Sequence, residues 1–376
     1  FPILHEGAST MPATSNRTAH FSESVIRGMT RLANECGAVN LSQGFPDFDP
    51  PRELTAALEE AARRGPHQYA VTWGAPAFRR ALAAKQRRFM GIDIDPDTNI
   101  VVTCGSTEAM MAAMMTACNP GDKVVIFSPF YENYTADTIL TGAEPIYVPL
   151  VPPDFSFDPA RLEDAFRQQP KALILCNPAN PSGKVFTRAE LEFIATLAKK
   201  YDTFVITDEV YEHIVYPPHV HTYMAALPGM FERTLSCSSL SKTYSITGWR
   251  LGYIIAPPAI IDAARKVHDF LTVGAAAPLQ EAALAGLAFP DSYYEGLTAE
   301  YAGLKKLFLE QLDEAGLTYT DPQGAYFVLA DIAPYLKPGQ TDVSFCEEMA
   351  EKVGVACVPG TSFFKEKVNN IVRLHF

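Results

Sequence analysis

Short apolar runs and helical patterns alternate along the chain from about residue 100 onward. Most of the runs are continuous stretches of valine, isoleucine and leucine, which are typical of strands buried on both faces of a sheet. Helical patterns such as "STEAMMAAMMTAC" and "RAELEFIATLAKKY" lie between them. This alternation predicts an α/β fold with a mostly parallel sheet and helices on both of its faces. The expected strands are "NIVVTC", "KVVIFS", "EPIYVPL", "KALILC", "TFVITD", "RTLSCSS" and "LGYIIA".

The pattern changes after Pro278. A long helical stretch, "DSYYEGLTAEYAGLKKLFLEQLDEAG", leads to short apolar segments and a second helical pattern, "DVSFCEEMAEKVG", which together indicate a smaller α+β domain. The N-terminal segment carries little regular pattern beyond "FSESVIRGMTRLANECG", and we expect it to pack on this smaller domain. The predicted division is residues 1–50 as an arm and part of the small domain, 51–285 as the large domain and 286–376 as the C-terminal small domain.

Composition narrows the possible partners. A chain of 376 residues with 48% hydrophobic content is long enough for two domains. Its formal net charge of -12 argues against nucleic acid as the main partner, because phosphate backbones require a basic face. No apolar run approaches the roughly 20 residues that cross a bilayer, so we expect no membrane span. The start, "FPILHEGAST", does not have the form of a secretory signal, and Met11 is a candidate natural start that follows a ten-residue extension.

The seven cysteines are scattered along the chain. No pair has C-x-x-C spacing and none stands with a pair of histidines, so neither a zinc site nor a redox dithiol is indicated. We expect buried thiols in a reducing compartment, the cytoplasm, and no metal.

Polar and aromatic side chains gather where the expected strands end. In sheets of this kind, ligands bind beyond the carboxyl ends of the strands. The segments that follow five of the strands are "GSTE", "PFY", "NPANPSG", "EVYE" and the one that contains Lys242. Together they predict a ligand site at this edge of the sheet.

Gly105, Ser106 and Thr107 are expected to begin a helix. Free backbone N–H groups, two hydroxyls and the positive end of a helix dipole suit a phosphate there, although the same residues can equally form a plain N-cap. The chain contains neither G-x-x-x-x-G-K-[ST] nor G-x-G-x-x-G, so the nucleotide-binding loops of those motifs are absent.

Three further features each leave two or more interpretations open. Asp208, at the end of an apolar strand with Tyr211 close behind, either faces solvent or holds a proton on a ring nitrogen of a ligand. The "NPANPSG" segment either is only a turn or fixes the amide of Asn180 as a hydrogen-bond donor. Lys242 lies among several hydroxyls, eight residues before Arg250, and is a surface residue, a proton carrier or a point of covalent attachment.

The combination of N-P-x-N-P-[ST]-G, D-E-x-Y and S-x-S-K with an arginine eight residues later resembles the class I and II aminotransferases, which are pyridoxal-phosphate (PLP) enzymes of fold type I. The resemblance extends from "LSQGFPDF" to "NIVRLHF". It implies a large PLP-binding domain with a mostly parallel seven-stranded sheet, a smaller α+β domain, PLP as cofactor, and a homodimer with shared active sites.

The resemblance also implies roles for the residues at matching positions. Lys242 would form the Schiff base with PLP and then serve as the general base, Asp208 would pair with the pyridinium nitrogen, and Tyr211 and Asn180 would hold the phenolic oxygen of the ring. Tyr131 would stack on the ring. The residues implied around the phosphate are Gly105, Ser106, Thr107, Ser239, Ser241 and Arg250, together with Tyr69 of the neighbouring subunit.

The substrate would be held at its α-carboxylate. Arg373 matches the arginine that grips this group in a bidentate fork, helped by Asn180 and by the backbone of Gly44. Relatives usually continue beyond this arginine into a terminal helix, whereas this chain stops three residues after it. We therefore expect incomplete packing around Arg373.

The absence of a second arginine suggests which kind of side chain the substrate carries. Aspartate-specific members carry a second arginine before the stretch matched here by "FLTVGAAAPLQ", which contains none, and Lys266 upstream cannot form the same fork. The segments "VNLSQGFPDF" and "PFYENY" most resemble the branch of kynurenine aminotransferases and glutamine transaminase K. We expect transfer of an amino group from a large neutral, aromatic, kynurenine-, glutamine- or methionine-like L-amino acid to a 2-oxo acid.

Parts of the sequence also fit several other functions. A PLP-dependent β-lyase of cystathionine type shares the fold and the lysine, and a (succinyl)diaminopimelate aminotransferase is a second alternative. "SLSK" also fits the S-x-x-K signature of serine acyl-enzymes, but S-D-N and K-T-G, which those enzymes need, do not occur. A non-catalytic ligand sensor of this fold would carry a basic helix-turn-helix extension, for which the chain has no room.

Overall fold

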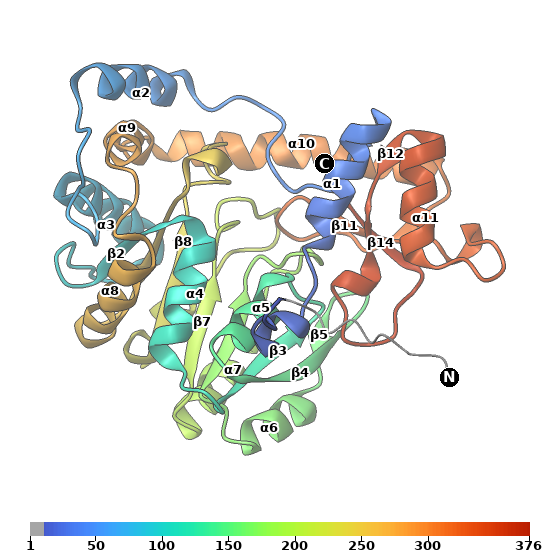
Figure 1. Ribbon diagram of the computed structural model, residues 1–376, viewed down its shortest axis with the longest axis horizontal. Helices are drawn as coiled ribbons and strands as arrows, with labels where there is room; N and C mark the ends of the chain where they lie inside the picture. The colour runs from blue at the N-terminus through green and yellow to red at the C-terminus, as the bar shows by residue number, and fades with distance from the viewer. Residues whose placement is uncertain (1–10) are drawn as a thin grey trace, which may run out of the picture.

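The computed structural model describes residues 11–376. The ten-residue extension expected before Met11 lies outside the described residues. Figure 1 shows a large sheet flanked by helices and, beside it, a smaller unit that contains both α1 and the C-terminal strands. In the part of the chain that is described, no helix combines the length and the apolar character needed to cross a membrane.

An eight-stranded sheet forms the centre of the larger unit, in the order β2-β9-β8-β7-β6-β3-β4-β5. The strands from β8 to β4 are parallel to one another, whereas β9 is antiparallel to both of its neighbours and β5 is antiparallel to β4. All seven strands expected from the sequence are present, and the two-residue β5 adds an eighth at one edge. The bounds are β2 (Ile100–Cys104), β3 (Lys123–Ser128), β4 (Glu144–Val151), β5 (Ser156–Phe157), β6 (Ala172–Cys176), β7 (Phe204–Asp208), β8 (Thr234–Ser239) and β9 (Leu251–Ile255).

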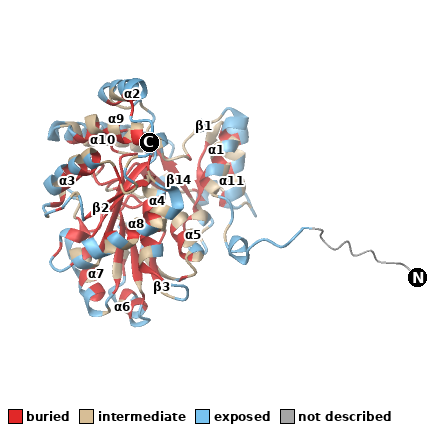
Figure 2. Cartoon of the chain, turned by 60° about the vertical axis from the view of Figure 1, so that its left-hand side comes forward, coloured by how far each residue is buried: buried red, intermediate tan, exposed pale blue. Residues whose placement is uncertain are grey.

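Helices cover both faces of this sheet because successive side chains of a strand point to opposite faces. In β3, Val124 and Ile126 belong to a core shared with α4, α5 and α8, whereas Val125 and Phe127 pack with α6 and α7. Figure 2 shows the result, with buried strands and exposed outer helix faces. The helices of this unit are α2 (Arg52–Arg64), α3 (Pro76–Met90), α4 (Gly105–Ala117), α5 (Asn133–Leu140), α6 (Pro159–Arg167), α7 (Arg188–Lys200), α8 (Pro258–Thr272) and α9 (Ala277–Leu287).

The smaller unit contains an antiparallel sheet in the order β10-β11-β14-β13 and a parallel pair, β1-β12. Met29 of α1 packs in one core with Val328 and Val372, so the N-terminal segment lies on the C-terminal strands. The domain boundaries at residues 50 and 285 stay a prediction. The elements are α1 (Val25–Cys36), α10 (Asp291–Glu314), α11 (Asp342–Glu348), β1 (Val39–Asn40), β10 (Thr318–Tyr319), β11 (Phe327–Asp331), β12 (Val355–Ala356), β13 (Val358–Pro359) and β14 (Ile371–His375).

Short helical turns complete the chain. The stretch "DVSFCEEMAEKVG" does not form one regular helix, because α11 passes into a π-helical turn, η6 (Met349–Val353). That turn closes when the N–H of Gly354 bonds the carbonyl of Met349, and Gly354 has a φ of 81°, which favours glycine. The 3₁₀ turns are η1 (Asn16–Ala19), η2 (Met224–Ala226), η3 (Phe231–Arg233), η4 (Thr247–Trp249), η5 (Ala333–Tyr335) and η7 (Gly360–Ser362).

Candidate active site

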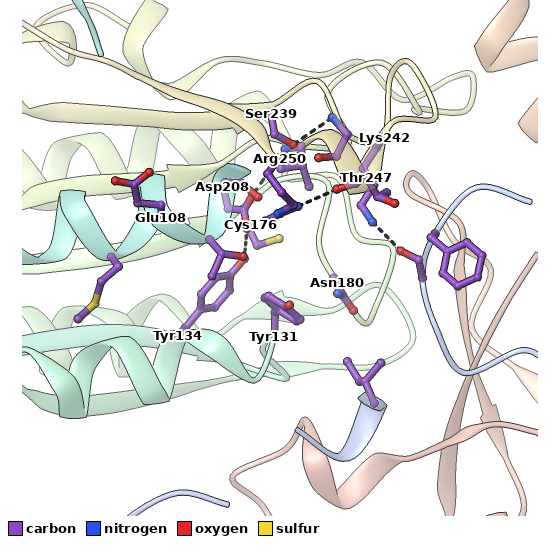
Figure 3. Close-up of a pocket in the computed structure, with 18 of the residues that line it drawn as sticks. Glu108, Tyr131, Tyr134, Cys176, Asn180, Asp208, Ser239, Lys242, Thr247 and Arg250 are labelled. Atoms are coloured by element: carbon purple, nitrogen blue, oxygen red, sulfur yellow. Dashed lines mark hydrogen bonds between the residues drawn. The ribbon is translucent and has the colours of Figure 1, made fainter. Parts of the chain in front are cut away.

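A cavity of about 790 Å³ opens at the carboxyl ends of β6, β7 and β8, and residues of the smaller unit close its other side. Figure 3 shows side chains from several strands and from α4 and α5 converging on it. Parallel strands present their carboxyl ends at one edge, which is why residues far apart in the sequence meet there. The predicted site residues that line the cavity are Gly44, Ser106, Thr107, Tyr131, Asn180, Asp208, Tyr211, Ser239, Ser241, Lys242, Arg250 and Arg373.

Lys242 follows β8 and points its amine into this cavity. Its Nζ donates a hydrogen bond to the carbonyl of Gly44 at 2.5 Å and lies 6.0 and 5.8 Å from the ring centres of Tyr211 and Tyr326. Burial, with the positive charges of Arg373 and Arg250 nearby, lowers the pKa of Lys242 to about 7. This lowered pKa favours the uncharged, nucleophilic form of the amine near neutral pH.

Asp208 ends β7 at the floor of the cavity. Burial raises the pKa of this carboxyl group, while a hydrogen bond from the Tyr134 hydroxyl to Asp208 Oδ2, at 2.8 Å, opposes that shift. A second carboxyl group of the cavity, that of Asp137, has its pKa raised to about 7 by burial and by the charge of Asp208. The phenol thus favours the charged form of Asp208 at a site where solvent cannot.

The first turn of α4 is shaped to admit a guanidinium group. Gly105 has a φ of 80°, and a Cβ atom at this position would lie 2.2 Å from Nη2 of Arg250. Gly252 is equally constrained, because its Cβ would lie 2.3 Å from the carbonyl carbon of Gly105. Two glycines therefore allow Arg250 and β9 to approach the positive end of α4 closely. Gly105 does not line the cavity itself but makes this arrangement possible.

Hydroxyl groups surround the first turn of α4. Ser106 and Thr107 come from α4, whereas Ser239 ends β8 and Ser241 follows it. The buried Oγ of Ser241 has no hydrogen-bond partner within the described chain. A buried hydroxyl without a partner is costly. Together with the free N–H groups of the helix and Arg250, it fits an anionic group of a ligand such as a phosphate.

Arg373 lies on the opposite side of the cavity, in β14. Its Nη1 donates to Asn180 Oδ1 at 2.7 Å, its Nη2 donates to the carbonyl of Ser42 at 2.5 Å, and Phe327 and Phe363 flank the guanidinium at 4.3 and 4.9 Å. Arg373 is only 1% exposed because these rings pack against it. The expectation of incomplete packing is therefore wrong.

No acidic side chain neutralises Arg373, since none in residues 11–376 forms an ion pair with it within 4.0 Å. Burial lowers its pKa to about 10, which still leaves the group charged at neutral pH. A buried cation with only neutral hydrogen-bond partners can hold an anion, and a planar guanidinium matches a carboxylate.

Two aromatic residues and one glycine shape the middle of the cavity. Tyr131 packs edge-on against Tyr134, with ring centres 5.8 Å apart, and burial raises its pKa to about 12. The Tyr211 ring lies edge-on to Phe327. A Cβ atom on Gly44 would lie 2.6 Å from Phe327, so only glycine allows the backbone to pass between the ring and Lys242.

Comparison with known proteins identifies the family. A family model described as aminotransferase class I and II matches residues 37–376. The chain is 37% identical to the probable N-succinyldiaminopimelate aminotransferase of Mycobacterium tuberculosis, over 93% of this chain and 88% of that protein. It is 35% identical to the methionine aminotransferase of Escherichia coli (94% and 91% covered) and to kynurenine–oxoglutarate transaminase 1 of Homo sapiens (89% and 86%).

The chain belongs to the class I and II aminotransferases. These are PLP-dependent enzymes, and both the predicted family and the predicted aminotransferase activity are confirmed. The solved structure of the M. tuberculosis enzyme superposes with a TM-score of 0.93, at 37% identity, over 97% of this chain and 95% of that one. The predicted fold, with its large mostly parallel sheet, is therefore confirmed as well.

Tyr69, unlike all other predicted residues except Gly105, does not line this aminotransferase's own cavity. It is 86% exposed and lies outside the lining. Its expected contact is with a neighbouring subunit, so that role stays a prediction.

Sequence reasoning missed several residues around the site of this aminotransferase. Tyr134 and Asp137 lie one turn apart on the buried face of α5, whereas the apolar residues Ala136, Ile139 and Leu140 lie on another face, so the pattern of "NYTADTIL" does not indicate that these two are buried. Glu108, in the first turn of α4, accepts hydrogen bonds from His268 Nδ1 at 2.6 Å and from Thr272 at 2.9 Å, while His268 Nε2 lies 2.7 Å from the carbonyl of Thr72. Nothing in the local sequence signals that pairing, because it joins α4 to α8.

Proposed function

We propose that this aminotransferase moves the amino group of a large, mainly neutral L-amino acid to a 2-oxo acid. The observation that carries the proposal is that one cavity holds an amine of lowered pKa, Lys242, a buried carboxylate, Asp208, and a buried guanidinium without an acidic partner, Arg373. These are the groups that a PLP-dependent transamination requires at its reacting centre.

The cavity fits PLP, with the phosphate at the start of α4. Asp208 would hold the proton of the ring nitrogen, Tyr131 would stack on the ring, and Tyr211 with the NH₂ group of Asn180 would hold the phenolic oxygen. When bound, the cofactor supplies an electron sink for the substrate Cα. The residues proposed around the phosphate are Gly105, Ser106, Thr107, Ser239, Ser241 and Arg250.

The chain itself supplies the proton transfer and the orientation. Lys242 would hold the cofactor covalently at rest and, once free, take the proton from the substrate Cα, a role that suits a pKa of about 7. Arg373 and the backbone at Gly44 would fix the α-carboxylate, which orients that Cα–H bond toward the amine.

The apolar lining supports a large neutral donor. Ile26, Phe45, Met111, Leu140 and Leu271 contribute to the cavity wall. Leu271 belongs to the stretch "FLTVGAAAPLQ", which contains no arginine. Methionine and kynurenine, named in two of the relatives, are donors of this kind. The N-succinyldiaminopimelate named in the first relative is the acidic alternative.

A homodimer is part of the proposal. Tyr69 and Phe270 are 86% and 92% exposed, and the bond between His268 and Thr72 joins the segments that carry them. Leu271, next to Phe270, lines the cavity, so a second copy seated here would reach the active site. All seven cysteines lie in the described chain and form no disulfide, which supports the cytoplasm as the compartment.

Reduction with borohydride tests the assigned lysine. PLP-loaded protein treated with borohydride should carry a stable adduct on the peptide that contains Lys242. Lys242→Ala should lose the adduct and all turnover, yet keep its melting temperature within a few degrees. The matched control is Lys266→Ala, which should change neither. An adduct on another lysine, or none, would refute the assignment.

A screen of donors against acceptors tests the reaction. Methionine, kynurenine, glutamine, phenylalanine and N-succinyldiaminopimelate should each be paired with pyruvate, 2-oxoglutarate and 2-oxohexanoate. Neutral donors should give the highest kcat/KM, and aspartate as the best donor would contradict the proposed class. Pyruvate and ammonia released from a β-substituted amino acid without an acceptor would identify a β-lyase instead.

A further inference from the structure

Four cationic side chains line the cavity among the described residues: Arg27, Lys242, Arg250 and Arg373. The proposed function gives three of them a partner: the cofactor for Lys242, the phosphate for Arg250 and the α-carboxylate for Arg373. Arg27 has no such assignment. A cavity that binds a substrate with one carboxylate has no need of this fourth positive charge.

Hydrogen bonds at the start of α1 hold Arg27 at the cavity rim. Ser24 caps the helix and accepts a bond from the N–H of Arg27, at 3.4 Å. The Glu132 carboxylate accepts bonds from Ser24 Oγ at 2.6 Å and from the N–H of Val25 at 3.0 Å. Glu132 directly follows Tyr131, a cavity residue, so the first turn of α1 is tied to the wall of the site.

The guanidinium of Arg27 forms no ion pair within 4.0 Å in residues 11–376. The neighbouring acidic side chains are already engaged: Glu23 binds Arg31 at 2.6 and 2.9 Å, and Glu132 binds the helix start. The charge of Arg27 does reach the site, because it opposes the rise that burial causes in the pKa of Tyr131. Arg27 is therefore a cavity cation available to a ligand.

Resting on the proposed function, we propose that Arg27 binds the distal carboxylate of a dicarboxylic substrate, above all a 2-oxo diacid that serves as amino acceptor. Arg373 would take the α-carboxylate, and Arg27 would take the second one with its planar fork. The side chain is exposed, so it can turn to solvent when an apolar donor fills the same space. One cavity can thereby accept a neutral donor and an acidic acceptor in alternate half-reactions.

A matched pair of acceptors tests this assignment. 2-Oxoglutarate carries the distal carboxylate, whereas 2-oxohexanoate has a similar length and ends in a methyl group. In Arg27→Gln we expect kcat/KM for 2-oxoglutarate to fall about 10- to 100-fold, as for loss of a charge-assisted hydrogen bond, with 2-oxohexanoate and the neutral donors changed by less than about twofold. Arg27→Lys should recover only part of the loss, since an ammonium lacks the fork.

The control variant is Arg161→Gln, at an exposed arginine of α6 outside the cavity lining, which should leave both acceptors unchanged. Competitive inhibition by glutarate against pentanoate gives a binding measurement independent of turnover, and only glutarate should weaken in Arg27→Gln. Equal losses for both acceptors, no loss for either, or a wild type that uses 2-oxohexanoate but not 2-oxoglutarate would overturn the assignment. A wild type without transamination of any pair would instead overturn the proposed function.

Discussion

At the floor of the cavity, a phenol helps to keep one carboxyl group charged. Asp208 is buried at the end of β7, which raises its pKa, and the hydrogen bond from Tyr134 counteracts that rise. Only the ionised form can pair with a protonated ring nitrogen. In the proposed site, Tyr134 would therefore be a positioning residue that acts through Asp208.

We expect Tyr134→Phe to lose activity at the acid side of the pH profile first. Without the phenol, the pKa of Asp208 rises further, so the carboxylate is protonated at a higher pH as the medium is acidified, and the acid limb of kcat/KM moves to higher pH. The loss at neutral pH should be about tenfold or more, as for a hydrogen bond to a charged group. The measurement is kcat/KM from pH 5 to 9.

Tyr147→Phe is the matched control for this prediction. It removes a phenol that bonds Thr135 at 2.9 Å, next to the same helix α5 but away from Asp208. Its acid limb should coincide with that of the wild type. An unshifted limb in Tyr134→Phe would show that the phenol only packs.

At the scale of elements, the start of α4 is the place where the sheet, a helix and a distant arginine meet. Gly105 adopts a left-handed φ, and its missing Cβ leaves room for Arg250. Behind this turn, Glu108 ties α4 to His268 of α8. Burial lowers the pKa of His268, but the hydrogen bond and charge of Glu108 outweigh it and raise the pKa overall. The proposed phosphate site thus depends on packing between elements.

Gly105→Ala should weaken PLP binding by about tenfold or more, because the added Cβ displaces Arg250 from the helix start. Gly121→Ala provides the control: Gly121 has a φ of 88° but nothing within 4 Å of its Cβ position. Both variants should lose about 1–2 kcal/mol of unfolding free energy from the left-handed backbone. Equal PLP affinity in the two variants, measured by titration, would contradict the role given to Gly105.

At the scale of the whole molecule, an exposed apolar patch adjoins the active site. Tyr69, Val71, Phe270 and Val273 are all exposed, and their two segments meet through the bond between His268 and Thr72. Exposed apolar side chains on two adjoining segments support the proposed dimer interface. In a two-fold dimer both copies contribute the same patch to the interface, so one substitution alters the interface at two places.

Phe270→Glu should raise the dimer dissociation constant by about 100-fold or more, since two buried phenylalanines of about 1.5–3 kcal/mol each are lost. Sedimentation equilibrium over a range of protein concentrations measures this constant. Val353→Glu, at another exposed apolar residue in the π-helical turn, should leave it unchanged. A wild type that remains monomeric at all concentrations would refute the dimer and, with it, the role of Tyr69.

Local patterns in the sequence are enough to predict the seven long strands, several helices and the polar cavity residues at strand ends, whereas Gly44 and Arg373 followed only from the family resemblance. The strands follow from runs of apolar residues, and the site follows from polar residues at strand ends, because parallel topology alone brings those ends to one edge. Ser106, Asp208, Ser239 and Lys242 reach the cavity for this reason.

Only the tertiary structure decided the contacts between elements that are distant in sequence. Tyr134 bonds Asp208 from a different element, Glu108 meets His268 across 160 residues, and the first turn of α1 brings Arg27 to a cavity formed mainly by other segments. The packing around Arg373, expected to be incomplete, also depends on distant rings. The physical reason is the same in each case. The pKa, the partners and the exposure of a side chain depend on three-dimensional packing, which the local periodicity of apolar and polar residues does not determine.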